Sequence, residues 1–214
     1  MKKTWGEYIA TIIFAVGLAF IVRQFVITAY KVPTGSMRPA LLPGDFVFVN
    51  RLAFKFGQEM KRGDLVAIEG IQQTNISYLK RIIAIEGDRV EIRNGILYLN
   101  GSPAQYKKGL EGFQNPSPDL FDVVEESHSF GSFPLIVSKE SGLKEFGPVV
   151  VPPGEVFLLG DNRDTSEDSR FWGTVSKDLI FGKVILIWMS VEVSKGPNGP
   201  SKMLRWDRIL TSPR

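Results

Sequence analysis

The sequence predicts a mainly β protein with one long apolar segment at its amino terminus. Residues 5–30 are largely apolar, whereas the rest of the chain alternates short apolar runs with turns rich in glycine, proline and asparagine. Short runs of β-branched and aromatic residues bounded by such turns are typical of strands. The chain of 214 residues has room for one domain or for two small ones.

The composition excludes several classes of function. Hydrophobic residues make up 43% of the chain, as expected for a protein with a packed core. The net charge of +3 is too small and too scattered to predict a nucleic-acid partner. The absence of cysteine excludes disulfides, thiolate catalysis and cysteine-bound metal. A Ser-His-Asp triad would have to use the single histidine, His128.

The amino-terminal segment, residues 1–30, is predicted to be a membrane anchor. A short basic stretch comes first, and the apolar run that follows is interrupted mainly by Glu7 and Arg23-Gln24. A helical span needs about 20 apolar residues, and Trp5 and Tyr30 stand where interfacial aromatic residues belong. A cleaved signal peptide is the alternative, but the run is long for one. Basic residues flank both ends, so the positive-inside rule does not decide the orientation.

A proline-rich loop over residues 31–45 follows this segment and presents Ser36 between Gly35 and Met37. Each of its prolines fixes φ and removes a backbone donor, so neither a regular helix nor a central strand can form there. Serine in such a loop often serves only in a turn, which is the alternative to a chemical role. A reactive Ser36 would lie a few residues beyond the anchor, close to a membrane surface.

Runs of apolar residues predict the strands. They cover residues 45–50, 65–68, 77–88, 90–92, 96–99, 156–159 and 184–189. The first of them is apolar on both alternating faces, which predicts burial on both sides. The Asn94-Gly95 turn predicts that two of them form a hairpin.

One predicted strand carries a lysine on an apolar face. Alternation of side chains places Lys80 with Ile82 and Ala84 and turns Arg81 to the opposite face. A lysine in such a position must pair with an acid or lose its proton. Two interpretations stay open, a lysine that protects a sheet edge and a desolvated lysine that acts as a general base.

The acidic loop over residues 160–173 could suggest a calcium site. Its spacing does not match an EF-hand. That motif needs oxygen ligands, followed by a glycine and a glutamate, where Arg163 and Thr165 stand. The interleaved Arg163 and Arg170 favour a network of hydrogen bonds and ion pairs instead. The sequence therefore predicts no metal at this loop.

The remaining segments predict little chemistry. Five prolines interrupt residues 102–148, which predicts a loop-rich inserted subdomain. An acidic patch precedes His128, and the two serines beside this residue predict a solvated loop histidine. The tail after Ser194 is rich in glycine and proline and then basic, which predicts a solvated end.

Four of these stretches resemble, in sequence and in order, the conserved boxes of bacterial signal peptidase I, the membrane-bound leader peptidase. They are Pro33-Thr34-Gly35-Ser36-Met37-Arg38-Pro39, Lys61-Arg62-Gly63-Asp64-Leu65-Val66, the segment from Tyr78 to Asp88 and the segment from Gly160 to Gly173. The resemblance does not extend to residues 102–148 or to the tail.

The resemblance implies a mainly β fold in which an amino-terminal transmembrane helix precedes a β-sheet catalytic domain with a loop-rich inserted subdomain. The implied parts are an anchor over 1–30, a catalytic domain over 31–101 and 149–194, an inserted subdomain over 102–148 and a basic tail over 195–214. A single-pass protein of the bacterial inner membrane is implied, with its amino terminus in the cytoplasm and its catalytic domain outside.

The resemblance also implies a serine endopeptidase that uses a Ser/Lys dyad without histidine. Ser36 would be the nucleophile and Lys80 the general base. Thr34 matches the side-chain donor of the oxyanion hole, beside the Ser36 backbone N–H, although many relatives have serine at this position. Residues that match supporting positions are Ser166, which orients the lysine, the ion pair of Asp168 and Arg170, and Asp161 and Arg81.

The implied substrates are exported preproteins, cut after small residues at the first and third positions before the bond. The end of the signal peptide would add to a sheet edge as a strand. The predicted partners are therefore signal peptides and membrane lipid, with no nucleic acid, metal or cofactor. Two alternatives are a non-catalytic membrane-anchored assembly or binding module and a dedicated peptidase for pilus or conjugation precursors.

Overall fold

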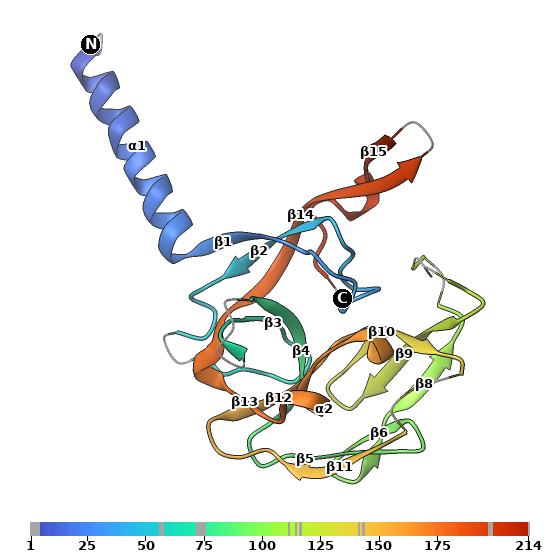
Figure 1. The fold of residues 1–214 in the computed structure, drawn as a ribbon. Helices are drawn as coiled ribbons and strands as arrows, with labels where there is room; N and C mark the ends of the chain where they lie inside the picture. The colour runs from blue at the N-terminus through green and yellow to red at the C-terminus, as the bar shows by residue number, and fades with distance from the viewer. Residues whose placement is uncertain are drawn as a thin grey trace.

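The protein consists of one amino-terminal helix and a body of antiparallel sheets (Figure 1). The structure is a computed structural model. It describes residues 5–55, 58–71, 76–110, 112–113, 115, 117–140, 142, 144–196 and 199–213. The predicted mainly β fold class is confirmed for the body of the protein.

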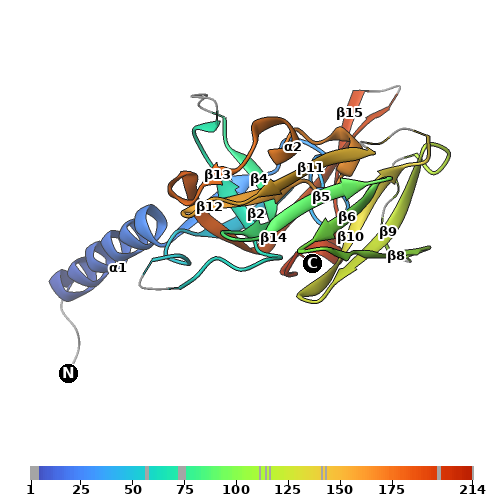
Figure 2. The ribbon, with the colours of Figure 1, turned by 90° about the horizontal axis from the view of Figure 1, so that it is seen from below.

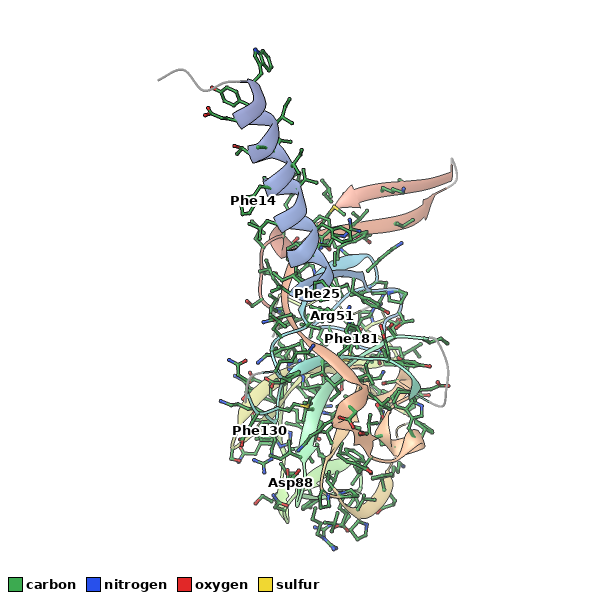
Figure 3. The ribbon with its side chains drawn as sticks, turned by 90° about the vertical axis from the view of Figure 1, so that its left-hand side faces the viewer. Phe14, Phe25, Arg51, Asp88, Phe130 and Phe181 are labelled. Carbon is green, nitrogen blue, oxygen red and sulfur yellow. The ribbon has the colours of Figure 1, made fainter. Side chains whose placement is uncertain are left out.

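Helix α1 (Trp5–Phe25) projects from one end of the body, and those of its apolar side chains that the structure describes are exposed. Phe14 is 71% exposed, and Figure 3 shows its ring standing clear of the sheets. Within the described part of the chain, no helix reaches both the length and the hydropathy expected of a membrane span. The transmembrane helix in the predicted fold class is not confirmed by the structure and stays a prediction.

The largest sheet in the described chain has eight strands and brings together segments that lie far apart in sequence. Its order is β1, β2, β14, β3, β4, β12 and β13, and β15 pairs with β14. The strands are β1 (Ile27–Lys31), β2 (Asp45–Asn50), β3 (Leu65–Ile68), β4 (Tyr78–Ile85), β12 (Glu155–Leu159), β13 (Val175–Ser176), β14 (Ile180–Gly196) and β15 (Gly199–Leu204). Because β12 lies beside β4, the acidic loop that follows β12 begins next to Lys80.

Within the described residues, four short helical segments with known bounds accompany the strands. They are η2 (Arg163–Thr165), α2 (Ser169–Trp172), η3 (Lys177–Leu179) and η4 (Trp206–Arg208). The first two lie within the acidic loop, whose backbone therefore turns tightly.

Strand β2 is not buried on both faces, so this prediction is wrong. Val47 and Val49 are fully buried, whereas Phe46 and Phe48 are only half-buried. The ring of Trp188 on β14 lies 5.6 Å from each phenylalanine ring, measured between centroids. A neighbouring strand of the same sheet thus covers part of the apolar face that would otherwise need a second layer.

The segment predicted as loop-rich contains one complete sheet and two strands of another, β7 and most of β11, so this prediction is also wrong. One sheet has the order β10–β9–β8 and lies at the end of the body away from α1 (Figure 2), and the other has the order β11–β5–β6–β7. The strands are β5 (Arg89–Arg93), β6 (Ile96–Leu99), β7 (Ser102–Pro103), β8 (Gln105–Lys108), β9 (Phe121–His128), β10 (Gly131–Ser138) and β11 (Glu145–Val150). Pro134 lies on an edge strand and Pro148 lies within a register shift, and both positions tolerate proline. Strands β5 and β6 belong to the predicted catalytic domain but pair with β11 and β7 of the predicted insertion. The predicted domain boundaries therefore stay a prediction.

The end of the tail, from Arg205 onward, packs against the body, unlike the solvated end that the sequence predicts. Asp45 is fully buried at the base of the Ser36 loop, and two arginines of the tail neutralise it. Arg208 Nη2 lies 2.7 Å from Asp45 Oδ2, and Arg205 Nη2 lies 3.5 Å from Oδ1. Both arginines also donate to loop carbonyls, those of Ala40 and Pro43. The tail therefore stabilises the loop that carries Ser36.

We expect Asp45→Ala to lower the free energy of unfolding by about 3 kcal/mol, because it leaves two mostly buried guanidinium groups without their carboxylate. Asp122→Ala is the control, since it removes a surface ion pair with Lys108 and should cost no more than about 1 kcal/mol. Urea unfolding of the two variants tests this, and equal losses would contradict the assigned role of Asp45.

Candidate active site

The Ser36 loop is closed at its base and anchored in the core. Val32 N donates to Asp45 O over 2.8 Å, and Gly44 N donates to Val32 O over 3.0 Å. The side chain next to Ser36, that of Met37, is 1% exposed and belongs to the apolar core under β2, β3 and β14. These anchors fix the loop while Ser36 itself stays half-buried, within reach of a substrate.

Thr34 and Asn162 lie next to Ser36 and its loop. Thr34 Oγ1 lies 3.3 Å from Ser36 Oγ. Asn162 donates twice to the loop, from its backbone N–H to Ser36 O over 3.0 Å and from Nδ2 to Gly35 O over 3.1 Å. The sequence pattern predicts no role for Asn162, although the residue lies within the acidic loop.

Lys80 lies on β4 and is 1% exposed. Its Nζ donates to Ser166 Oγ over 2.8 Å and lies 5.6 Å from the ring centre of Trp172. Burial lowers the pKa of Lys80 to about 8, although the Asp168 carboxylate acts in the opposite direction. The Arg170 guanidinium adds to the lowering. A fraction of the amine is therefore neutral near pH 7, as a general base requires.

Asp168 neutralises Arg170 and orders the backbone around Ser166. Arg170 donates to Asp168 through Nε and Nη2, each over 2.8 Å, so the two residues form a bidentate ion pair. Asp168 Oδ2 also accepts a hydrogen bond from Gly160 N over 3.0 Å, and the carboxylate caps α2. The structure thus brings Asp168 and Arg170 together as an ion pair, and their role in supporting the site stays a prediction.

Arg81 and Asp161 form a second buried ion pair. Arg81 Nε and Nη2 donate to Asp161 Oδ1 and Oδ2 over 2.8 and 2.7 Å. Arg81 Nη1 donates to Gly63 O over 2.9 Å, and the guanidinium lies 4.2 Å from the ring centre of Phe133. The pair therefore joins β4 to the start of the acidic loop, and neither residue is among those that line the cavity beside Ser36.

One cavity of about 410 Å³ contains both Ser36 and Lys80. Its described lining residues are Tyr30, Val32, Pro33, Thr34, Gly35, Ser36, Met37, Ile76, Ser77, Tyr78, Leu79, Lys80, Thr165 and Glu167. A larger cavity of about 660 Å³ is lined by none of the predicted site residues. The smaller cavity is the candidate site, because it combines a serine, a lysine of lowered pKa and apolar walls.

Gly160 allows the Ser36 loop and the Ser166 segment to lie close together. A Cβ atom at this position would lie 2.1 Å from Ser166 Oγ and 2.6 Å from Ser36 O, closer than packed atoms come. Only a residue without a side chain lets the Ser36 loop and the Ser166 segment approach this closely. The sequence shows this glycine, but its reason becomes visible only in the structure.

His128 is not a solvated loop residue, so this prediction is wrong. It ends β9, and its side chain is 4% exposed. Its Nε2 lies 2.8 Å from Glu126 Oε1, and its ring stacks on Phe130 at 4.8 Å between centroids. It is not among the described residues that line the cavity with Ser36 and Lys80, so the geometry does not support a histidine triad.

Comparison with known proteins places the chain in a family. A family model described as signal peptidase, peptidase S26, matches residues 5–189. The chain belongs to this family. The resemblance predicted from the four boxes is therefore confirmed, and this signal peptidase family member is a serine endopeptidase.

Two curated relatives support this assignment. Signal peptidase I of Aquifex aeolicus is 35% identical over 206 residues, covering 80% of this chain and 79% of the relative. Signal peptidase IB of Staphylococcus aureus is 35% identical over 186 residues, covering 86% of this chain and 89% of the relative. A crystal structure of a signal peptidase I from Enterococcus faecalis V583 matches at 24% identity, with 58% of this chain and 96% of that chain covered. Its TM-score of 0.36 is too low to support an argument about the site.

We expect Gly160→Ala to lower kcat at least ~100-fold, because the added methyl group separates the Ser36 loop from Ser166. The control is Gly87→Ala, where a Cβ atom meets open space and only the φ of +84° opposes the change. That variant should cost about 1 kcal/mol of stability and keep wild-type kcat. Peptide cleavage and thermal unfolding of both variants are the measurements. Wild-type kcat in Gly160→Ala would show that this close approach is not needed.

Proposed function

We propose that the protein removes signal peptides from exported preproteins, with Ser36 as nucleophile and Lys80 as general base. The observation that carries this proposal is the cavity shared by Ser36 and a buried lysine whose pKa is lowered to about 8. Membership of the signal peptidase family and the names of the curated relatives support the substrate class. Peptidase family membership also argues against a non-catalytic binding module.

The proposed reaction depends on the neutral form of the Lys80 amine. Neutral Lys80 accepts the proton of the Ser36 hydroxyl as Oγ attacks the scissile carbonyl and an acyl-enzyme forms. The same proton then passes to the leaving amine, and a water molecule hydrolyses the ester with Lys80 again as base. Ser166 accepts one N–H of Lys80, which orients the amine while its lone pair stays available. Ser166 is in this proposal the residue that positions the base.

The oxyanion of the tetrahedral intermediate needs donors next to Ser36. We assign this role to the Ser36 backbone N–H and the hydroxyl of Thr34, which lies 3.3 Å from Ser36 Oγ. Removal of one such donor typically costs about 2.7–4 kcal/mol of transition-state stabilisation. Asn162 holds the carbonyl of Ser36 and so fixes the loop without contacting the substrate.

The walls of the cavity favour an extended peptide with small side chains. Val32, Met37 and Leu79 contribute apolar surface between the Ser36 loop and β4. A peptide that adds as a strand presents alternate side chains to one face, so its first and third residues before the scissile bond would enter this surface. Cleavage after small residues is the specificity that we infer.

We place the protein at the bacterial inner membrane, with α1 as a single-pass anchor and the catalytic domain outside. Exposed apolar residues on α1, such as Ile13 and Phe14 at 66% and 71%, support contact with lipid. The hairpin of β14 and β15 projects from the body on the same side as α1 (Figure 1). Met203 on β15 and Trp206 beyond it are 69% and 74% exposed, which supports membrane contact at this end.

The proposal is tested by incubating the full-length protein in detergent with a radiolabelled preprotein. Ser36→Ala should fold normally and lose at least ~1,000-fold in cleavage rate, because no other group supplies the nucleophile. Ser132→Ala on β10 is the control, since it removes an exposed hydroxyl that bonds only to Ser127 among the described side chains. Turnover by Ser36→Ala within a few-fold of wild type would remove Ser36 from the mechanism.

A second variant separates two roles of the lysine. Arginine keeps the positive charge but cannot deprotonate, since its pKa exceeds about 12. We therefore expect Lys80→Arg to lose the chemical step while still binding preprotein, whereas Lys183→Arg, on β14, should stay active. The neutral amine is the active form, so wild-type kcat/KM should rise with pH to a plateau, with a midpoint at about 8. Substantial single-turnover cleavage by Lys80→Arg with the wild-type pH profile would contradict the assignment.

A further inference from the structure

A buried cluster of polar groups around Glu126 has no role in the proposed mechanism. Glu126 lies on β9 and is fully buried, in the segment to which the sequence assigned no chemistry. Arg163 Nη2 donates to Glu126 Oε1 over 2.6 Å, and Arg163 Nη1 donates to Oε2. Tyr106 OH donates to Oε2 over 2.6 Å, and His128 Nε2 lies 2.8 Å from Oε1. Three side chains thus contact the carboxylate. Those of Tyr106 and His128 come from the same sheet, and that of Arg163 comes from the acidic loop.

The charge of this carboxylate is firmly held. Burial is the largest single effect and on its own would raise the pKa of Glu126, but the Arg163 guanidinium and the hydrogen bond with His128 together hold the pKa well below its ordinary value. A bidentate pair between arginine and carboxylate fixes the orientation of both groups as well as their distance. Arg163 is therefore held in one orientation by a strand of the β8–β9–β10 sheet.

Arg163 directly follows the residue that holds the Ser36 loop. Asn162 donates to the carbonyls of Ser36 and Gly35 over 3.0 and 3.1 Å. Arg163 O accepts a hydrogen bond from Arg170 Nη2, and Arg170 pairs with Asp168 beside the lysine. A displacement of Arg163 would move both the support of Ser36 and the surroundings of Lys80.

Strand β10 holds the same segment through its backbone. Ile136 N donates to Asp161 O over 2.9 Å, and Ile136 forms an isolated parallel bridge with Asn162. Ser138 N donates to Asp164 Oδ2 over 2.5 Å. Residues 161–164 have no regular strand or α-helix of their own to fix them, so their position depends on this sheet and on the Arg81–Asp161 ion pair at the start of the segment. The side-chain contact in the middle of the segment is that of Arg163 with Glu126.

We propose that Glu126 is a positioning residue for the reaction. Through Arg163 it fixes Asn162, and thereby the distance and orientation of Ser36 relative to Lys80. This inference rests on the proposed function, because it presumes that these two residues carry the chemistry. It also gives the β8–β9–β10 sheet a role, that of a rigid support for the segment on which the catalytic loop rests.

The experiment measures kcat and KM for preprotein cleavage by the full-length protein in detergent. Glu126→Gln and Arg163→Gln should each lower kcat roughly 10- to 100-fold, because a shift of about 1 Å in reacting groups has effects of this size. KM should stay within about threefold, since the walls of the substrate cavity are unchanged. The matched control is Asp122→Asn. Asp122 lies on the same strand as Glu126, and the change removes only its surface ion pairing with lysines such as Lys108 on β8, so kcat should stay at the wild-type value.

The double variant Glu126→Gln/Arg163→Gln decides between positioning and stability. It leaves no unpaired buried charge, so it remains folded even where a single variant does not, as circular dichroism can verify. If Glu126 acts through Arg163, the double variant should lose no more kcat than the single ones, because the second change removes nothing further. A folded double variant with wild-type kcat, or one altered in KM alone, would overturn the inference.

Ser36→Ala, measured in parallel, separates this inference from the proposed function. An active Ser36→Ala variant would refute the proposed function. An inactive one, together with wild-type kcat in the folded double variant, would refute only the role of Glu126.

Discussion

Exclusion of water from the Lys80 amine is the constraint on which the rest of the site depends. An ammonium group on an apolar strand face is unfavourable unless it finds a counterion or loses its proton. Asp168 is close enough to favour the charged form, but burial outweighs it. The carboxylate of Asp168 is already shared between Arg170 and the backbone of Gly160, so it cannot serve Lys80 alone. The result is an amine that can lose its proton near neutral pH.

The groups that surround this amine come from an irregular segment rather than from a strand. Buried backbone outside regular structure must find a partner for each donor and acceptor. Between Gly160 and Asp168 these partners come from β10, from the Asp168 carboxylate and from the Ser36 loop. The contacts that satisfy the segment are thus the same contacts that bring serine and lysine to one cavity.

The loop on the other side of the cavity depends on residues that the family comparison does not cover. The family match ends at residue 189, whereas Arg205 and Arg208, which neutralise the buried Asp45, follow it. Membership of the signal peptidase family therefore explains the chemistry of the chain better than it explains how this chain holds Ser36 in place. The tail holds the Ser36 loop, and the β8–β9–β10 sheet holds the acidic segment that contacts this loop.

From local patterns the sequence predicts the β class, the shaped loop around Ser36, the apolar setting of Lys80 and the family. These properties follow from local rules, since proline fixes its own backbone and alternation along a strand assigns each side chain to a face. It did not determine that Glu126 and His128 are buried, that Gly160 lies against Ser36 and Ser166, or that the tail returns to Asp45. Those properties depend on which distant segments meet, and a polar residue has the same local pattern whether it meets water or a buried arginine. Only the tertiary structure decided them, because burial and charge pairing arise from contacts between residues far apart in the chain.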